Sequence, residues 1–292
     1  MNIVILSRNA GLYSTRSLVN AAYRKNHDVR VIDHMSCDLV IDRNDHAIYF
    51  QGERLEGVDA IIPRIGTTAT THGSAVIRHF VNMGVYSTLQ SAALLLARDK
   101  LSCLQALTAA GMDVPRSIIS NNYYEMSDMI DRVGEMPVVI KMIKGTHGLG
   151  VILSETKRNA ESILEAFHKS KDKVMLQEFI REAKGADVRA FVVDHEVVGA
   201  MKRQAKPGEF RSNLHRGASS TIVQLTEEER LIAIKAAQTM GLEIAGVDML
   251  QTSKGPLVLE VNASPGLEGI ETTTKVDIAG KIIDMVQRNL KK

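Results

Sequence analysis

Two short segments near the C-terminus constrain the fold of this chain more than any others. Residues 246–250 (GVDML) and 257–266 (LVLEVNASPG) both alternate between polar and apolar side chains, as strands do. The stretch between them, 252–256 (TSKGP), has the residue types that form tight turns. The sequence therefore predicts a β-hairpin.

The register of this hairpin decides which side chains share a face. If the turn is centred near Lys254, Asp248 lies opposite Glu260 and Asn262 lies opposite Gly246. Residues two apart in a strand point to the same side and are roughly 7 Å apart along the chain. The oxygen-bearing side chains of Asp248, Glu260 and Asn262 are thus expected on one face. The opposite face is predicted to be apolar, with Val247, Met249, Leu257, Leu259 and Val261.

Carboxylate and amide oxygens are the ligands that Mg²⁺ or Mn²⁺ prefers, with water and substrate phosphates completing the shell. A glutamate between two other ligands can bridge two ions about 4 Å apart and so hold a transferring phosphoryl group. Asp248, Glu260 and Asn262 are therefore candidate metal ligands. The alternative is a hairpin with a solvated polar face, because Asn-Ala-Ser-Pro-Gly can simply end a strand.

Composition excludes several classes of protein. The 292 residues are 45% hydrophobic and 24% charged, with a net charge of +2, which is ordinary for a globular protein and gives no reason to expect nucleic-acid or membrane binding. Cys37 and Cys103 form no CxxC pair, so neither a zinc site nor a disulfide framework is indicated. No signal peptide and no run of 18 apolar residues is present, and a cytoplasmic location is expected.

The chain is predicted to divide into three parts. Residues 1–97 alternate strands and helices in the βαβ pattern of a small parallel sheet, without the GxGxxG of a dinucleotide site. Residues 98–178 form a second part and 179–292 a third, mostly antiparallel part. Strands are predicted at Ile3–Ser7, Val29–Asp33, Ala60–Pro63, Arg116–Ile119, Val138–Met142, Val151–Leu153 and Val174–Ile180. Helices are predicted at Ser14–Lys25, from about Arg98 to Gly111, near Tyr124–Val133, at Thr156–His168 and from about Glu227 to Met240, the last with a capping box.

A glycine-rich turn, 144–150 (KGTHGLG), joins two of these strands. Its glycines allow close approach of the backbone to a ligand, and its N–H groups can form an anion-binding nest. The alternative is an ordinary hairpin loop. Lys141 precedes this turn in an apolar strand, where a triphosphate with about four negative charges would explain a lysine. A lysine that reaches out to water at the strand end is the other interpretation.

A run of basic residues lies between Met201 and Arg216. It contains Lys202, Arg203, Lys206, Arg211 and Arg216, and Glu209 is its one acidic residue. Arginines form paired hydrogen bonds with carboxylate and phosphate oxygens. Taken alone, such a run indicates a solvated surface loop. Beside a metal hairpin and a glycine-rich flap, it indicates an anion site for phosphates and an acidic substrate.

Several motifs together resemble a known family. They occur in this order: PRIGT (63–67), ARDK (97–100), KGTHGLGV (144–151), DVRAFVV (187–193), EFRSNLHRG (209–217) and EVNASPGLEGIE (260–271). The chain resembles the ATP-grasp carboxylate–amine ligases, and within them the RimK-type ribosomal-protein glutamate ligases, over nearly its whole length. The related LysX-type ligases share most nucleotide residues. Ala218 follows Gly217 where this family pattern has a second glycine, which affects local loop geometry.

The resemblance implies an α/β (α+β ATP-grasp) fold: an N-terminal Rossmann-like domain (1–97), a small ATP-grasp subdomain (98–178) and a large one (179–292). It also implies roles for individual residues. ATP would be contacted by Lys100, Lys141, Glu178, Phe179, Asp187, Arg211, Ser212 and Asn213. Asp248 and Glu260 would hold one Mg²⁺ (or Mn²⁺), and Glu260 with Asn262 a second. Arg189 and Arg203 would stabilise the transferring charge, and Arg64 would bind a substrate carboxylate.

In such a ligase, ATP converts an acceptor carboxylate to an acyl phosphate, and an amine then displaces phosphate to form an amide. The resemblance implies L-glutamate as the amine, the glutamate-ended acidic C-terminal tail of a small-subunit ribosomal protein as the acceptor, and a homotetramer. Binding to nucleic acid or to membranes is not expected.

Other functions remain open at this point. An ATP-grasp ligase that acts on a small peptide, an amino-group carrier protein or free glutamate would keep the same nucleotide residues. A nucleotide-sensing module without turnover belongs to a different class, and release of ADP that depends on an acceptor distinguishes it from the ligases. Histidine- or cysteine-based catalysis is disfavoured, because the nine histidines form no HExxH and Cys103 lies on an apolar helix face.

Overall fold

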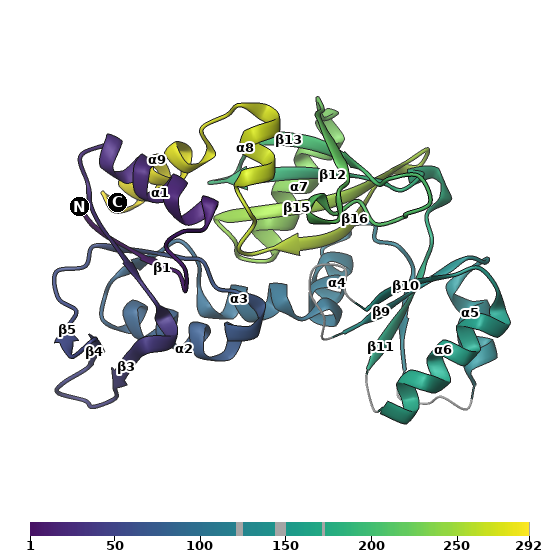
Figure 1. Ribbon diagram of the computed structural model, residues 1–292, viewed down its shortest axis with the longest axis horizontal. Helices are drawn as coiled ribbons and strands as arrows, with labels where there is room; N and C mark the ends of the chain where they lie inside the picture. Colours follow the sequence, from purple (N-terminus) through teal and green to yellow (C-terminus); the bar gives the residue numbers. More distant parts are fainter. Residues whose placement is uncertain (121–124, 144–149, 171–172, 292) are drawn as a thin grey trace.

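The computed structural model describes residues 1–120, 125–143, 150–170 and 173–291 of the chain. Within these residues, three larger sheets occupy different parts of the molecule, one for each predicted part of the chain (Figure 1). A smaller sheet of three strands accompanies the first of them. No helix of the described residues is long and apolar enough to cross a membrane.

The first sheet is parallel and has the strand order β2-β1-β6-β7. Its strands are β1 (Asn2–Leu6), β2 (Asp28–Ile32), β6 (Ala60–Pro63) and β7 (Tyr86–Ser87). Residues 3–6 of the central strand β1 are all buried, as expected for a parallel strand that is covered on both faces. The predicted parallel sheet in residues 1–97 is confirmed.

Helices and a short antiparallel sheet complete the first part. The helices are α1 (Tyr13–Arg24), α2 (Thr70–Asn82) and α3 (Ser91–Arg98), and the added strands are β3 (Cys37–Val40), β4 (Ala47–Phe50) and β5 (Glu53–Arg54). The predicted helix from about Arg98 to Gly111 is instead α4 (Lys100–Ala109), separated from α3 by Asp99. The Asp99 side chain accepts a hydrogen bond from the Ser102 N–H at 2.7 Å, so it caps α4 where α3 ends.

The second sheet is antiparallel, in the order β10-β9-β11-β8. Its strands are β8 (Ser117–Ile119), β9 (Val138–Met142), β10 (Val151–Ser154) and β11 (Val174–Glu178), and its helices are α5 (Met126–Val133) and α6 (Lys157–Ser170). The strand and helix predictions for this part are confirmed to within a few residues. The predicted helix start at Tyr124 and the glycine-rich residues 144–149 lie outside the described residues.

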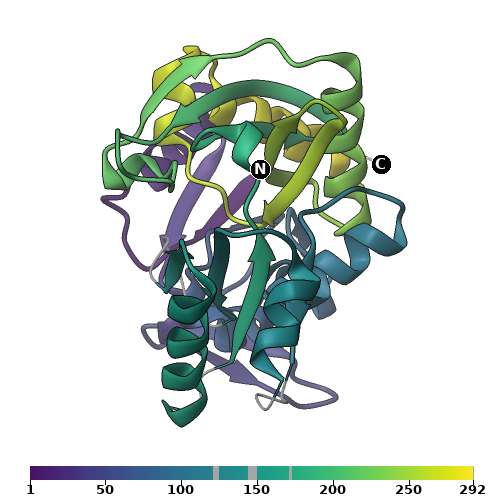
Figure 2. The ribbon, with the colours of Figure 1, turned by 90° about the vertical axis from the view of Figure 1, so that its right-hand side faces the viewer.

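The alternation of side chains along β9 determines where Lys141 points. Val138 and Ile140 pack in one apolar cluster with residues of α5 and α6, so both helices cover that face of the sheet. Lys141 is one residue further along the strand and therefore projects from the opposite face. Lys141 is close enough to Glu260 on β16 for the charge of that carboxylate to affect its pKa. Figure 2 shows the third sheet above this part of the molecule.

The third sheet is antiparallel, in the order β14-β13-β12-β15-β16. Its strands are β12 (Ala186–Val193), β13 (Glu196–Gln204), β14 (Ser219–Ile222), β15 (Ile244–Thr252) and β16 (Gly255–Asn262). Its helices are α7 (Glu227–Thr239), α8 (Glu268–Thr274) and α9 (Ile278–Asn289), and short 3₁₀ turns are η3 (Arg181–Ala183) and η4 (Leu214–Arg216). The predicted antiparallel part is confirmed.

The hairpin β15–β16 has the predicted register, with Asp248 opposite Glu260 and Gly246 opposite Asn262. The predicted apolar face is wrong for Leu257 and Leu259, which are both only partly buried. A β-bulge places Met249 opposite Val258, so Val258 is buried in the core while Leu259 is only partly buried. The extra residue breaks the period of two that the prediction assumed.

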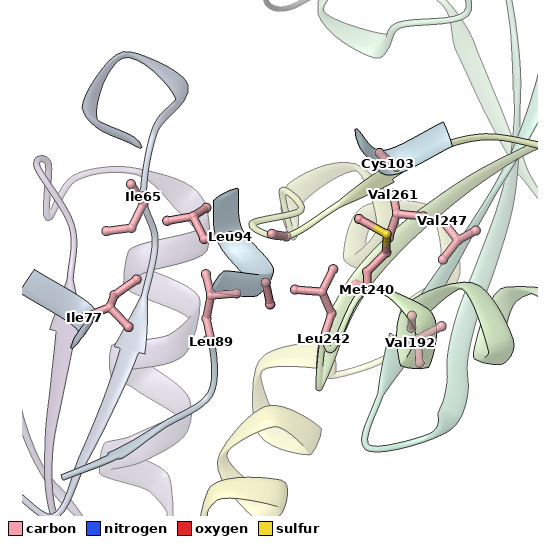
Figure 3. Packing of buried hydrophobic residues seen from close by; sticks show 14 of the residues in the cluster. Ile65, Ile77, Leu89, Leu94, Cys103, Val192, Met240, Leu242, Val247 and Val261 are labelled. Atoms are coloured by element: carbon pink, nitrogen blue, oxygen red, sulfur yellow. The ribbon is translucent and has the colours of Figure 1, made fainter. Parts of the chain in front are cut away.

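The first and third sheets share their apolar core. One cluster of buried residues runs from Ile65 and Ile77 through Leu94 and Leu242 to Val247 on the third sheet (Figure 3). A second cluster contains residues of β1 and of the C-terminal helix α9, which packs against α1. These two parts of the chain therefore form one packed body.

The second sheet has a core of its own, made with α5 and α6. Figure 1 shows this part beside the rest of the molecule and joined to it through α4 and the segment after β11. No single cluster of buried residues contains both cores, and α4, which joins the two, packs with the first and third sheets.

We predict that Thr226→Ala lowers the free energy of unfolding by about 1 kcal/mol. Thr226 and Glu229 form the capping box of α7, in which the Glu229 N–H donates to the Thr226 hydroxyl at 3.1 Å and the Thr226 N–H donates to Glu229 at 2.8 Å. Urea denaturation measures the change. Thr226→Ser keeps the hydroxyl and serves as the control, and equal losses in both variants would contradict the capping role.

Candidate functional site

The polar face of the β15–β16 hairpin carries the predicted metal ligands. Glu260 is exposed, and the Asn262 side-chain amide donates to its Oε1 at 3.1 Å. Asp248 is 2% exposed and lies directly across the hairpin from Glu260. The three predicted residues are thus brought to one face, with Glu260 at the surface and Asp248 below it.

Two arginines bind Asp248 from neighbouring strands. Arg189 on β12 donates from Nε and Nη2 to the two Asp248 oxygens at 2.6 and 2.5 Å. Arg203 on β13 lies 2.9 Å from Asp248 Oδ2 and donates to both oxygens of Asp187 at 2.6 and 2.7 Å. Asp187 also accepts from the Ser212 hydroxyl at 2.5 Å. Arg203 therefore bridges two buried carboxylates across the sheet.

This arrangement lowers the pKa of Asp248 and raises the pKa of Asp187. Burial works to raise the pKa of Asp248, but Arg189 and Arg203 outweigh it and hold that pKa at about 2. Burial raises the pKa of Asp187, and the nearby charge of Asp248 adds to this, while Arg203 and Ser212 oppose it. The difference has a plain cause, because Asp248 has two guanidinium partners and Asp187 has one. Asp248 is therefore held as a carboxylate.

Two lysines from the second part of the chain, Lys100 and Lys141, lie close enough to Glu260 for its charge to affect their pKa values. Burial lowers the pKa of Lys141 to about 8, the positive charge of Lys100 adds to this shift, and Glu260 opposes it. Burial also lowers the pKa of Lys100, whose ammonium donates to the Ile143 carbonyl at 3.0 Å. Lys141 makes no hydrogen bond or ion pair with the described residues. Such a desolvated ammonium group favours an anionic ligand.

Arg64 extends from the end of β6 toward the segment that follows the hairpin. It donates to the Pro265 carbonyl at 2.6 Å and to the Ser264 carbonyl at 3.5 Å. Burial lowers its pKa to about 10, and Arg98 adds to this shift. In the structure Arg64 thus holds the turn next to Asn262. Its predicted contact with a substrate carboxylate stays a prediction.

Arg98 is a site residue that the sequence reasoning did not single out. It donates to the Ile65 carbonyl at 2.6 Å, and burial lowers its pKa while Glu260 opposes that shift. Its Nε is buried without a partner among the described residues. The signal was present in the sequence, because Arg98 lies two residues before Lys100 in the ARDK motif.

The remaining predicted nucleotide residues surround the segment after β11. Glu178 accepts a hydrogen bond from the Arg116 N–H at 3.4 Å. The Phe179 ring meets the Phe210 ring edge to face, with centroids 6.4 Å apart. Arg211 donates to the Val151 carbonyl at 3.5 Å, which links the basic run to the strand β10 of the second sheet. Asn213 precedes η4 and is partly buried.

The side-chain oxygens of Asp248, Glu260 and Asn262 suit a hard cation such as Mg²⁺. Glu260 offers a carboxylate at the surface, with an amide beside it and a buried carboxylate opposite, which is an all-oxygen set of the kind that magnesium prefers. The described residues contain no group of three or more His, Cys, Asp or Glu side chains arranged around a metal. The predicted site therefore depends on the amide of Asn262 and on oxygens that a bound substrate would add.

Comparison with known proteins identifies the family. The RimK-like ATP-grasp domain matches residues 97–286, and the RimK PreATP-grasp domain matches residues 1–94. The chain belongs to the RimK family of ATP-grasp ligases. Members of this family are ATP-dependent enzymes that form amide bonds, and the protein is such a ligase.

Close relatives span almost the whole chain. The protein named "Probable alpha-L-glutamate ligase 2" from Shewanella denitrificans is 52% identical over 291 residues, which cover 100% of this chain and 97% of the relative. The "Probable alpha-L-glutamate ligase" of Vibrio cholerae is 50% identical over 289 residues, 99% of this chain and 96% of the relative. The RimK resemblance stated from the motifs is confirmed.

Solved structures confirm the fold. The ATP-grasp ligase PsnB, complexed with its minimal precursor, superposes with a TM-score of 0.78 at 22% identity, covering 98% of each chain. The RimK domain ATP-grasp protein of Sphaerobacter thermophilus superposes with a TM-score of 0.74 at 20% identity, covering 98% of this chain and 99% of that one. The predicted ATP-grasp architecture is thereby confirmed.

We predict that ATP binding takes up a proton above about pH 8 and that Lys141→Met reduces this uptake. Lys141 loses its proton as the pH rises through about 8 in the free protein, and the negative phosphates restore it on binding. ATP affinity should then fall up to about tenfold per pH unit above that value. Calorimetry in two buffers of different ionisation enthalpy measures the uptake. Lys169→Met, at an exposed position on α6, is the control, and unchanged uptake in Lys141→Met would contradict the assignment.

Proposed function

We propose that the protein is an alpha-L-glutamate ligase that adds L-glutamate to the C-terminal glutamate of an acidic protein tail, through an acyl-phosphate intermediate. The observation that carries this proposal is the full-length identity of 50–52% to relatives with that name. The tail of a small-subunit ribosomal protein is the acceptor that we propose. The basic run around Arg211 supports an acidic acceptor of this kind.

The proposed reaction has two balanced steps. An oxygen of the acceptor carboxylate attacks the γ-phosphorus of ATP, and ADP leaves, which forms the acyl phosphate. The amine of glutamate then attacks the acyl carbon, inorganic phosphate leaves, and the attacking nitrogen loses a proton. Water at this site would hydrolyse the acyl phosphate, so the site has to be closed during turnover.

We propose that the metal ions are held at the hairpin. Asp248 and Glu260 would hold one magnesium ion, and Glu260 with Asn262 a second, with manganese as the alternative metal. When bound, such ions neutralise charge on a transferring phosphoryl group. The low pKa of Asp248 supports its role, because a ligand must be deprotonated.

The protein's own cations would bind the phosphates. Lys100 and Lys141 lie on the second part of the chain, and their pKa values are already lowered by burial, so an anion would restore the charge on both. The Phe179 backbone and Glu178 would line the adenine, Asp187 would lie at the ribose end, and the segment Arg211–Asn213 would contact the nucleotide from the third part.

Of the two proposed catalytic arginines, Arg189 is better placed to act on the substrate. Its side chain is 14% exposed, whereas that of Arg203 is 5% exposed and bonded to two carboxylates. We therefore propose that Arg189 stabilises the transferring charge directly, and that Arg203 acts by holding Asp187 and Asp248 in position.

We propose that the division into 1–97, 98–178 and 179–292 is also a functional one. The separate core of the second sheet supports this in part, since that sheet with α5 and α6 could close over ATP as a unit, while α4 packs with the first and third sheets. The lysines would then approach the hairpin that carries Glu260.

We predict that Glu260→Gln lowers ligation on the order of a hundredfold or more while stability changes by less than about 0.5 kcal/mol. Glu260 is exposed, so its loss removes a metal ligand without disturbing the core. This variant tests the site more cleanly than Asp248→Asn, which would also leave two buried guanidinium groups short of a charge partner.

Phosphate release and thermal denaturation measure the effects of Glu260→Gln on ligation and on stability. Glu196→Gln, exposed at the start of β13, is the control. Full activity in Glu260→Gln would contradict the metal assignment.

The proposed function is tested by intact mass spectrometry after incubation with ATP, magnesium, glutamate and a ribosomal-protein fraction. We expect a series of glutamyl additions on one small-subunit protein. ATP consumption without a change in protein mass would instead favour a small-molecule acceptor or free glutamate. The omission of glutamate, with all else unchanged, is the control for ATP hydrolysis that is not coupled to ligation.

A further inference from the structure

The loop between β13 and β14 borders an open cavity of about 560 Å³, within the range of about 300–1,000 Å³ that is typical of ligand sites. The described residues that line it are Lys206, Pro207, Gly208, Glu209, His215 and Arg216. A second cavity, of about 520 Å³, shares residues 206–209 and extends to Lys184 and Ser219. Two cavities that meet along one loop are better suited to an extended chain than to a compact small molecule.

The charges that line these cavities are unequal. Glu209 accepts from the backbone N–H groups of Phe210 and Arg211 at 2.9 and 3.0 Å, and from Arg211 Nε and Nη2 at 2.9 and 2.7 Å. Its negative charge is therefore already compensated by Arg211. The Arg211 hydrogen bonds also hold the pKa of Glu209 at about 2, so it stays ionised and bound to its partner.

The cationic side chains that line these cavities have fewer partners than Glu209 has. Arg216 Nε lies 3.7 Å from Glu209 Oε2 and is buried without a hydrogen bond among the described residues. The ammonium groups of Lys184 and Lys206 have no ionic partner in the described part of the chain. The cavities are thus lined by positive charge that the protein itself leaves largely unpaired.

Lys206 is exposed, and its side chain lies across Gly217. A Cβ atom at Gly217 would lie 2.4 Å from Lys206 Nζ and 2.6 Å from its Cε, so the lysine crosses the space that this glycine leaves open. Gly217 has φ +86°, a conformation that glycine adopts readily. The loop therefore combines a turn that favours glycine with a cationic side chain that lies against that turn.

Other residues of the β13–β14 loop connect it to the proposed reaction site. Ser212 donates to Asp187, which is bonded to Arg203 beside Asp248. Arg211 contacts Val151 on the second sheet and therefore faces the proposed nucleotide site. Neither Ser212 nor Arg211 lines the cavities. The basic cavities are thus adjacent to the proposed nucleotide contacts but are formed by different side chains.

We propose that these cavities bind the acidic residues that precede the acceptor's terminal glutamate, with Lys206, Arg216 and Lys184 pairing with successive carboxylates. This rests on the proposed function and adds a subsite to it. Charge complementarity of this kind favours a polyanionic peptide and weakens as salt is raised. A terminus that gains glutamates would become a better ligand as it grows.

The test measures peptide binding separately from turnover. Fluorescence anisotropy follows a labelled peptide that ends in four glutamates and a matched peptide in which glutamine replaces all but the last of them. We expect the full-length protein to bind the first peptide roughly tenfold more tightly. The double variant Lys184→Gln/Lys206→Gln should weaken that binding about five- to twentyfold and leave the Kd for ATP unchanged. Lys281→Gln, exposed on α9, is the matched control.

The outcomes separate the subsite from the proposed function. Equal affinity for the two peptides, or unchanged binding in the double variant, overturns the subsite even if glutamate is added to both peptides. A weaker Kd for ATP in the double variant also overturns it, since the cavities would then belong to the nucleotide site. Selective, lysine-dependent binding of the acidic peptide without any addition of glutamate supports the subsite and contradicts the proposed acceptor chemistry.

Discussion

The ion pairs around Arg203 constrain the rest of the site. One guanidinium, 5% exposed, bonds to Asp187 on β12 and to Asp248 on β15, and Arg189 completes the set. Breaking such a buried pair by removing one partner costs about 3–5 kcal/mol, because a charge is left uncompensated. The network therefore holds three neighbouring strands in one register. It also fixes the acidic end of the site before any ligand binds.

The second constraint is the division of the site between two packed bodies. The carboxylates lie on the body that contains the first and third sheets, whereas Lys141 belongs to β9 of the second sheet, and Lys100, at the start of α4, donates to the Ile143 carbonyl that follows β9. The turn η3 forms hydrogen bonds with both bodies. Arg181 donates to the Met136 carbonyl of the second part, and Glu182 accepts from the Ser253 N–H of the third part at 2.6 Å. A change at this turn would alter how close the lysines come to Glu260.

Sequence reasoning succeeded where local chemistry decides the structure. The turn residues around Lys254 set the hairpin register, and the apolar run before the glycine-rich turn predicted the strand that carries Lys141. It failed at the bulge beside Leu259, because a period of two cannot show where one residue is added. The pairing of Asp248 with Arg189 and Arg203 could not be predicted either. Those residues are far apart in the sequence, and their contacts depend on the strand order of the third sheet.

The choice of acceptor has to depend on parts of the molecule other than the shared framework. PsnB, which was solved with a precursor peptide, and a protein named D-cycloserine synthetase share this fold, with TM-scores of 0.78 and 0.73, so the fold alone does not determine what such a protein acts on. Loops on a rigid scaffold are where such differences usually lie. The β13–β14 loop meets this requirement, because Ser212 ties it to the buried ion pairs while Lys206 and Arg216 stay available for a ligand. Exchange of those cations can then alter the acceptor without disturbing the carboxylates that hold the site together.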